Sequence, residues 1–218
     1  MLPELKIGNL KAKLPIIQGG MAVRISTAPL AAAVANEGGI GVIAATGMSI
    51  GELRKEIKKA RELSKGIIGV NVLFAVKEFA NLIKTAMEEG IDLVISGAGI
   101  SRDMYSWGKN FNVPIVPIVS SIKLATLAEK MGAAAIVVEG TEAGGHLGTD
   151  CSMREILPQV RKAVSVPVIG AGGVFTGRDI LEVLSLGANG VQMGTRFAAA
   201  QESNASQAFK ELYVNAEE

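Results

Sequence analysis

The 218-residue sequence predicts a closed (βα)8 barrel, the fold known as a TIM barrel. Short apolar runs alternate with helix-like segments from one end to the other, which is the pattern of parallel β–α units. Eight such units are present at a spacing of about 20 to 30 residues, and eight is the number that closes a barrel. Glycine clusters follow most of the strands. The alternative, an open doubly wound sheet, would instead concentrate its ligand signals where the strand order reverses.

Eight apolar runs are the predicted strands. They are rich in Val, Ile and Ala, as expected for parallel strands buried on both faces. Pro117 is awkward within the fifth strand and must lie where its missing N–H is not needed. The predicted strands are residues 15–18, 40–44, 67–72, 92–96, 113–119, 134–138, 166–170 and 190–193.

Helical patterns fill most of the intervals between these strands. Ser26 is a candidate N-cap for the first helix, and Gly38 a candidate stop signal after it. No linker or low-complexity break interrupts the pattern, so residues 1–218 are expected to form one domain. The predicted helices are residues 26–37, 49–64, 76–89, 122–131, a segment beginning near Thr176, and residues 205–215.

The composition excludes several classes of function. A formal net charge of +1 gives no electrostatic footprint for nucleic acid. No apolar run approaches the roughly 20 residues that span a bilayer, and the N-terminus lacks the apolar core of a signal peptide. One cysteine and one histidine make a Cys- or His-based metal site very improbable and an intramolecular disulfide impossible. We therefore expect a cytoplasmic protein that contacts neither nucleic acid nor membrane.

Glycine-rich segments at the strand ends converge on one mouth if the barrel closes. A single glycine pair is as consistent with a tight turn as with a ligand. The pair of clusters after the seventh and eighth strands is more specific, because loops at these positions commonly bind phosphate through backbone N–H groups. The segments are QGGM (18–21), GVN (69–71), SGAG (96–99), VSS (119–121), EGTEAGGH (139–146), GAGGV (170–174) and QMGT (192–195).

His146, the single histidine, is the candidate catalytic residue. It follows a strand and two glycines, so its imidazole is placed where a ligand can approach, although a surface histidine is the alternative. Cys151 is disfavoured as a nucleophile because the sequence offers no separate base and orienting group for it. No GxGxxG follows the first strand, which leaves a Rossmann-type NAD site unsupported, and no GxxxxGK[ST] is present either.

Three polar side chains at the ends of apolar strands are candidates for orienting a flat heterocycle: Asn71, Glu139 and Gln192. They could also satisfy one another structurally, since burying them without hydrogen bonds costs free energy. Lys123 and Arg196 are secondary candidates that could equally be surface residues.

Seven motifs together resemble the nitronate monooxygenase family, formerly called 2-nitropropane dioxygenases, over about residues 4–215. The flavin-dependent enoyl-ACP reductases share the fold and most of these motifs. The resemblance implies an FMN-binding TIM barrel. The motifs are PIIQGGM, NEGGIGVI, GVNVL, SGAG, VEGTEAGGHLG, PVIGAGGV and GANGVQMGTRF.

The resemblance assigns expected roles position by position. Gly20 and Met21 would lie along the flavin, and His146 matches the active-site histidine near its reactive edge. Further positions that contact FMN in the family are matched by Asn71, Glu139 and Gly144. The phosphate and ribityl site is matched by Gly172, Gly173, Gln192, Met193, Gly194 and Thr195.

The resemblance also implies the reaction and its competitors. The leading expectation is oxidation of an alkyl nitronate by O2 to a carbonyl compound and nitrite. The alternatives are an NAD(P)H-dependent FMN enoyl-ACP reductase and a flavin-binding barrel without turnover. The partners are a small-molecule substrate and O2, with a homodimer as an option. The sequence stops at NAEE where family members usually continue, so most of a C-terminal extension that covers the active site is expected to be lacking.

Overall fold

Eight parallel strands close into a barrel in a computed structural model that describes residues 2–97, 99–145 and 149–216. The last strand pairs with the first, so the barrel has no free edge, and the open-sheet alternative is wrong. All eight strands lie where the sequence predicted them, within about two residues. They are β3 (Ile16–Gln18), β4 (Ile40–Ala44), β5 (Ile67–Leu73), β6 (Leu93–Gly97), β7 (Ile115–Val119), β8 (Ile136–Glu139), β9 (Val168–Ala171) and β10 (Gly190–Met193).

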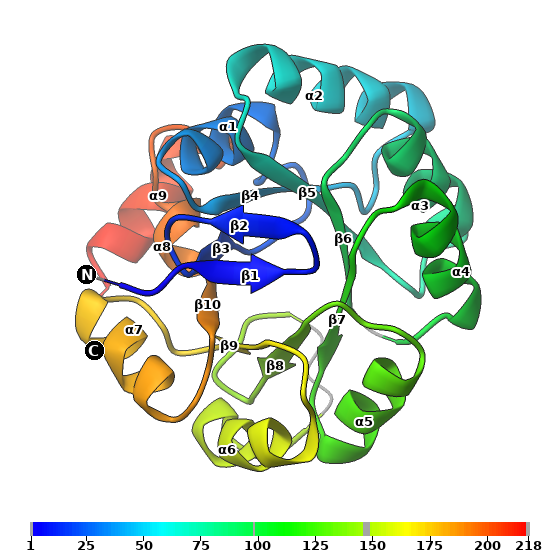
Figure 1. The fold of residues 1–218 in the computed structure, drawn as a ribbon. Coiled ribbons are helices and arrows are strands. Elements are labelled where there is room, and N and C mark those ends of the chain that lie inside the picture. The colour runs from blue at the N-terminus through cyan, green and yellow to red at the C-terminus, as the bar shows by residue number, and fades with distance from the viewer. Residues whose placement is uncertain (1, 98, 146–148, 217–218) are drawn as a thin grey trace.

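Helices form the outer ring (Figure 1). Ser49, Ser121 and Thr176 each accept a backbone N–H at the start of a helix, which confirms the predicted starts at 49, 122 and near 176. The helices are α1 (Ala28–Asn36), α2 (Ile50–Leu63), α3 (Phe79–Glu88), α4 (Arg102–Phe111), α5 (Ile122–Lys130), α6 (Met153–Ala163), α7 (Gly177–Ser185), α8 (Thr195–Ala198) and α9 (Gln207–Val214).

Three helices, α4, α6 and the single turn α8, were not predicted, and the first two each contain a residue that disfavours a helix. Gly108 lies within α4, where a Cβ would come 2.7 Å from Cγ1 of Ile115, so packing against β7 requires the glycine. Pro158 lies inside α6, which is otherwise fixed by a capping box between Ser152 and Glu155. Tertiary packing and capping therefore outweigh local propensity.

The predicted N-cap at Ser26 is wrong. α1 begins two residues later, and Ser26 is fully buried with its hydroxyl in another hydrogen-bond network, described below. Gly38 follows the helix with a φ of +89°, which confirms its role as a stop signal.

The floor of the barrel is an N-terminal hairpin that the sequence analysis did not predict. β1 (Leu5–Ile7) and β2 (Leu10–Ala12) pair antiparallel and lie across the barrel opening in Figure 1. Leu5 and Ile7 are buried in one cluster with inward-facing residues of the barrel strands. The barrel is thus closed at the end where the strands begin, which leaves the other end for a ligand.

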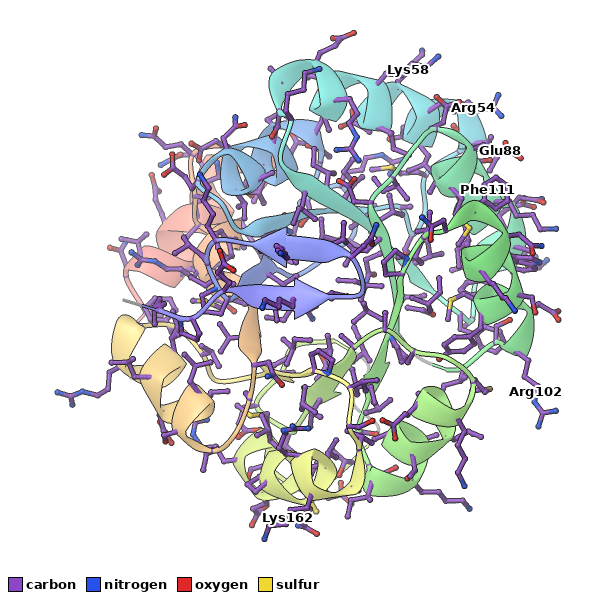
Figure 2. The ribbon with its side chains drawn as sticks, in the orientation of Figure 1. Arg54, Lys58, Glu88, Arg102, Phe111 and Lys162 are labelled. Atoms are coloured by element: carbon purple, nitrogen blue, oxygen red, sulfur yellow. The ribbon has the colours of Figure 1, made fainter. Side chains whose placement is uncertain are left out.

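Outward-facing residues of the strands form a second core with the helices. α2 illustrates how: Leu53 and Ile57 are buried in this layer, while Arg54 and Lys58 point outward (Figure 2). Arg54 pairs with Glu88, at 3.5 Å, and with Glu89, at 3.2 Å, of the neighbouring α3 end. In the described part of the chain, every helix is too short or too polar to cross a membrane.

Candidate active site

A cavity of about 650 Å³ opens at the carboxyl ends of the barrel strands. All eleven residues predicted to bind a cofactor line it, from the loops after β3, β8, β9 and β10 and from the ends of β5, β8 and β10. The structure therefore brings together side chains that are far apart in the sequence. The eleven are Gly20, Met21, Asn71, Glu139, Gly144, Gly172, Gly173, Gln192, Met193, Gly194 and Thr195.

The loop after β3 is held in place by two fully buried polar residues, Gln18 and Ser26. The Gln18 amide donates to the Ser26 hydroxyl at 2.9 Å and accepts from the Val42 N–H at 2.9 Å. The Ser26 hydroxyl accepts from the Met21 N–H at 3.0 Å and donates to the Gly19 carbonyl at 3.3 Å. This network fixes the backbone path of Gly19–Met21 into the cavity.

Gly20 lies against Asn71 with no room for a side chain. A Cβ on Gly20 would come 2.4 Å from Cβ and 2.9 Å from Cγ of Asn71. Glycine therefore lets the β3 loop approach β5 directly, and the Asn71 amide side chain is confined beside the loop that carries Met21.

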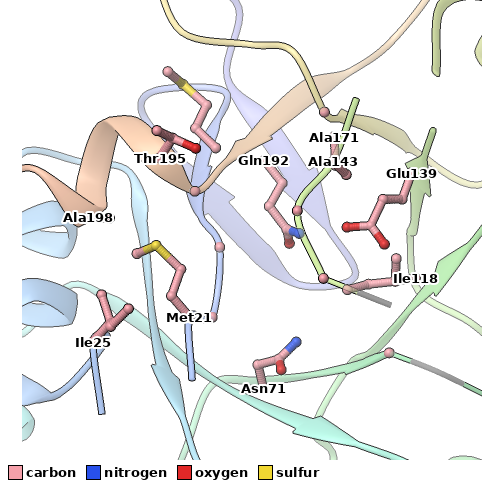
Figure 3. Close-up of a pocket in the computed structure, with 18 of the residues that line it drawn as sticks. Met21, Ile25, Asn71, Ile118, Glu139, Ala143, Ala171, Gln192, Thr195 and Ala198 are labelled. Carbon is pink, nitrogen blue, oxygen red and sulfur yellow. The ribbon is translucent and has the colours of Figure 1, made fainter. Parts of the chain in front are cut away.

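The polar ends of three strands face the same space. Figure 3 shows the side chains of Asn71, Glu139 and Gln192 extending into the cavity from β5, β8 and β10. Gln192 is 8% exposed, and its side-chain oxygen has no hydrogen-bond partner in the described part of the chain. A buried acceptor without a donor is costly, so this atom points to a bound N–H group.

Burial raises the pKa of Glu139 to about 7. The cause is desolvation of the charged form. The carboxyl group is therefore largely protonated below neutral pH and ionised above it.

Two glycine loops form the wall after β9 and β10. Gly172 and Gly173 have φ values of +108° and +61°, a backbone conformation that favours glycine. Gly194 precedes the single turn of α8, and Thr195 is the first residue of that turn. Exposed backbone N–H groups in such turns are suited to an anion such as phosphate.

The segment after β8 is anchored at its start and open at its end. Gly140 is packed against the backbone of Met153, whose N–H donates to the Glu142 carboxylate at 2.8 Å. Gly144 and Gly145 line the cavity with no heavy atom within 4 Å of an added Cβ. His146, the predicted catalytic residue, follows directly and lies outside the described residues.

Several lining residues were missed by the sequence analysis. Glu142 follows β8, and Phe209 and Tyr213 reach the cavity from α9, where their rings contact edge to face at a centroid distance of 4.9 Å. The pair spaced i, i+4 in a helical pattern could have signalled one face of a helix, but not which surface it covers.

The secondary candidates do not line the cavity. Lys123 is exposed on α5. Arg196 is exposed, and its guanidinium lies over the Phe175 ring at 5.4 Å. Cys151 is exposed as well, and its amide N–H donates to the Thr149 hydroxyl.

The lining fits a flavin. An isoalloxazine ring has an imide N–H donor and carbonyl acceptors, which match the amides of Asn71 and Gln192, including the unpartnered oxygen of Gln192. The glycine loops suit the phosphate end. The fold and this lining are those expected of a flavin-dependent oxidoreductase.

Comparison with known proteins gives the family. The nitronate monooxygenase family model matches residues 4–92 and 74–218. The chain is 33% identical to a probable nitronate monooxygenase of Staphylococcus aureus (strain Newman), over 96% of this chain and 71% of that protein. The chain belongs to the nitronate monooxygenase family, which is related to the flavin-dependent enoyl-ACP reductases.

Solved structures agree with this placement. A mutant of FabK from Thermotoga maritima superimposes with a TM-score of 0.90 and 38% identity, covering 94% of this chain and 68% of that one. Nitroalkane oxidase from Streptomyces ansochromogenes gives a TM-score of 0.86 and 28% identity, covering 92% of this chain and 70% of that one. Both share the barrel architecture described above.

Proposed function

We propose that the protein is an FMN-dependent nitronate monooxygenase, which oxidises alkyl nitronates with O2 to carbonyl compounds and nitrite. The observation that carries the proposal is the convergence of residues 142–145 and 192–195, which belong to the EAGGHLG and VQMGTRF motifs, on one cavity that is also lined by Gly20, Met21 and Asn71. The proposed partners are a small-molecule substrate and O2, and the proposed location is the cytoplasm.

FMN would be held at two ends of the cavity. Asn71, Glu139 and Gln192 would bind the polar edge of the ring, with Gly20 and Met21 along its face and Gly144 beside it. The phosphate and ribityl chain would lie against the loops after β9 and β10, at Gly172, Gly173, Met193, Gly194 and Thr195. When bound, FMN would supply the redox chemistry by mediating electron transfer between the nitronate and O2.

The remaining tasks fall to side chains. A nitronate is an anion, and His146 would orient it or handle a proton near the reactive edge of the flavin. Glu139 would avoid repelling that anion while its carboxyl group is protonated, which its pKa of about 7 allows below neutral pH. The protein thus provides a binding site whose charge suits an anionic substrate.

A substitution tests the role of His146. His146→Ala is expected to lower turnover of a nitronate on the order of a hundredfold, because general acid–base groups contribute at least that much. Cys151→Ala is the matched control five residues away and is expected to keep full activity. Full turnover in the His146 variant with flavin still bound would reject the assignment.

The test of the function is spectroscopic. Purified protein, reconstituted with FMN if colourless, is mixed anaerobically with a nitronate and, separately, with NADH. Bleaching of the flavin spectrum by the nitronate alone, with recovery on admitting air, is the expected result. A yellow protein that no donor reduces would instead indicate a flavin-binding barrel without turnover.

The second candidate is an FMN-dependent enoyl-ACP reductase that uses NAD(P)H. The identity of 38% to FabK, against 28% to nitroalkane oxidase, favours keeping the related reductases in the test. This candidate predicts bleaching by NADH alone, followed by reoxidation with an enoyl thioester. The same anaerobic experiment therefore separates the two.

A further inference from the structure

We propose that Arg154 is a positioning residue that locks the phosphate loop, residues 172–176, to the loop that leads into His146, residues 140–145. Arg154 is the second residue of α6 and does not line the cavity. The proposal rests on the proposed function, because these two loops are the ones assigned to the cofactor and to the catalytic histidine.

Arg154 bridges three different segments. Its Nε and Nη2 atoms bind the two oxygens of Glu182 on α7 at 2.7 and 3.2 Å. Nη1 lies 3.6 Å from a carboxylate oxygen of Glu142, and Nη2 donates to the Gly173 carbonyl at 3.4 Å. The planar guanidinium, with five donors in a rigid fork, can serve all three at once, which a lysine cannot.

The two loops touch, so their positions depend on each other. A Cβ on Gly172 would come 2.9 Å from the Ala143 nitrogen, and one on Gly173 would come 3.3 Å from Cβ of Glu142. Both residues that Arg154 reaches in these loops, Glu142 and Gly173, line the cavity. A shift of one loop would therefore displace the other at the cavity wall.

The positive charge of Arg154 also offsets the negative charge of the carboxylates around it, which helps hold the two loops together. Arg154 faces the carboxylates of Glu142, Asp179 and Glu182. Asp179 in turn accepts the backbone N–H groups of Phe175 and Thr176, at 3.0 and 2.6 Å, so it holds the far end of the phosphate loop. Removing the guanidinium would leave three carboxylates to repel one another where the loops meet.

Arg61 provides a matched control at the opposite end of the barrel. It pairs with Asp92 at 2.7 Å and donates to the carbonyls of Gly66 and Gly90, at 3.1 and 2.9 Å. Gly66 and Asp92 precede β5 and β6, so this arginine makes the same kinds of contact away from the cavity. Arg154→Met and Arg61→Met therefore remove comparable interactions in different places.

The first measurement is amide hydrogen exchange on the ligand-free protein. Arg154→Met is expected to speed exchange several-fold in both segments, 140–145 and 172–176, whereas Arg61→Met changes neither. Arg154→Lys, which keeps the charge, should give an intermediate effect and is used alone if the Met variant does not fold. Exchange that rises in one segment only, or in neither, would overturn the proposed lock.

The second measurement compares two flavins. Arg154→Met is expected to weaken FMN binding on the order of tenfold, the size of one charge-assisted hydrogen bond, and to weaken riboflavin binding clearly less. Riboflavin lacks the phosphate, so an equal loss for both ligands, or no loss, would contradict a role at the phosphate loop. If the wild-type protein binds no flavin, the proposed function fails, and hydrogen exchange alone decides whether Arg154 locks the loops.

Discussion

The carboxyl group of Glu139 makes the folding stability of the ligand-free protein depend on pH. Its pKa is raised by burial from the ordinary value of 4.5 to about 7. The folded state therefore holds the proton more tightly. The favourable contribution is complete below the unfolded pKa and is lost as the pH rises through about 7.

We expect Glu139→Gln to stabilise the ligand-free protein at pH 8 by on the order of 1 to 3 kcal/mol, and to have little effect near pH 4. Urea denaturation across this pH range measures it. Glu129→Gln is an opposite-sign control, because hydrogen bonds from Ser165 lower the pKa of Glu129, so that substitution removes stability at neutral pH. A Glu139 variant whose advantage does not grow with pH would show that burial of the charge is not the cause.

A substitution at Gly20 tests how closely the backbone of the loop after β3 must approach β5. Gly20→Ala would force a Cβ to within 2.4 Å of the Asn71 side chain, and overpacking of this kind costs about 1 to 3 kcal/mol. Because the clash would move the Asn71 side chain out of position, we also expect Gly20→Ala to weaken flavin binding. Gly51→Ala on α2, with open space at its Cβ, is the control and should leave flavin binding unchanged. Equal flavin titrations for both variants would count against the predicted contact.

Ser26, just before α1, shows how tertiary contacts can override a local helix-start pattern. Its spacing before an apolar helix suits an N-cap, yet its hydroxyl joins the buried network with Gln18 and Met21. We expect Ser26→Ala to lower the free energy of unfolding by about 1 to 3 kcal/mol, because the buried donors of Gln18 and Met21 would lose their acceptor. We also expect it to lower flavin affinity. Ser49→Ala, which removes the cap of α2, should cost about 1 kcal/mol without affecting flavin. Denaturation and flavin titration of both variants distinguish the two roles.

The N-terminal hairpin is the β element that the sequence analysis missed. Its strands are three residues each, too short for alternation to stand out from the surrounding loop. Leu5 is 1% exposed on the barrel floor, so Leu5→Ala is expected to cost about 2 to 5 kcal/mol. Flavin affinity should not change, since the cavity lies at the other end. Leu10→Ala, at a half-buried position, should cost less in the same urea titration.

For the whole molecule, the barrel and its cavity were predictable because both arise from repetition. Eight apolar runs set the strand count, and the end of each run marks the same face, so Asn71, Glu139 and Gln192 were placed correctly from their positions alone. What could not be predicted depends on contacts between units. Arg154 meeting Gly173, or α9 bringing Phe209 to the cavity, leaves no periodic signal in the chain.

The pairing of β10 with β3 also affects the order in which the barrel can fold during synthesis. Val191 pairs with Ile16, and Leu5 of the hairpin packs close to Gly190, so these contacts of the N-terminal part form only after the eighth barrel strand has been made. A chain emerging from a ribosome would hold an open sheet with an exposed apolar edge until then. Ring closure is therefore a late, long-range event in folding, and a nascent chain halted before β10 is expected to depend on chaperones to avoid aggregation.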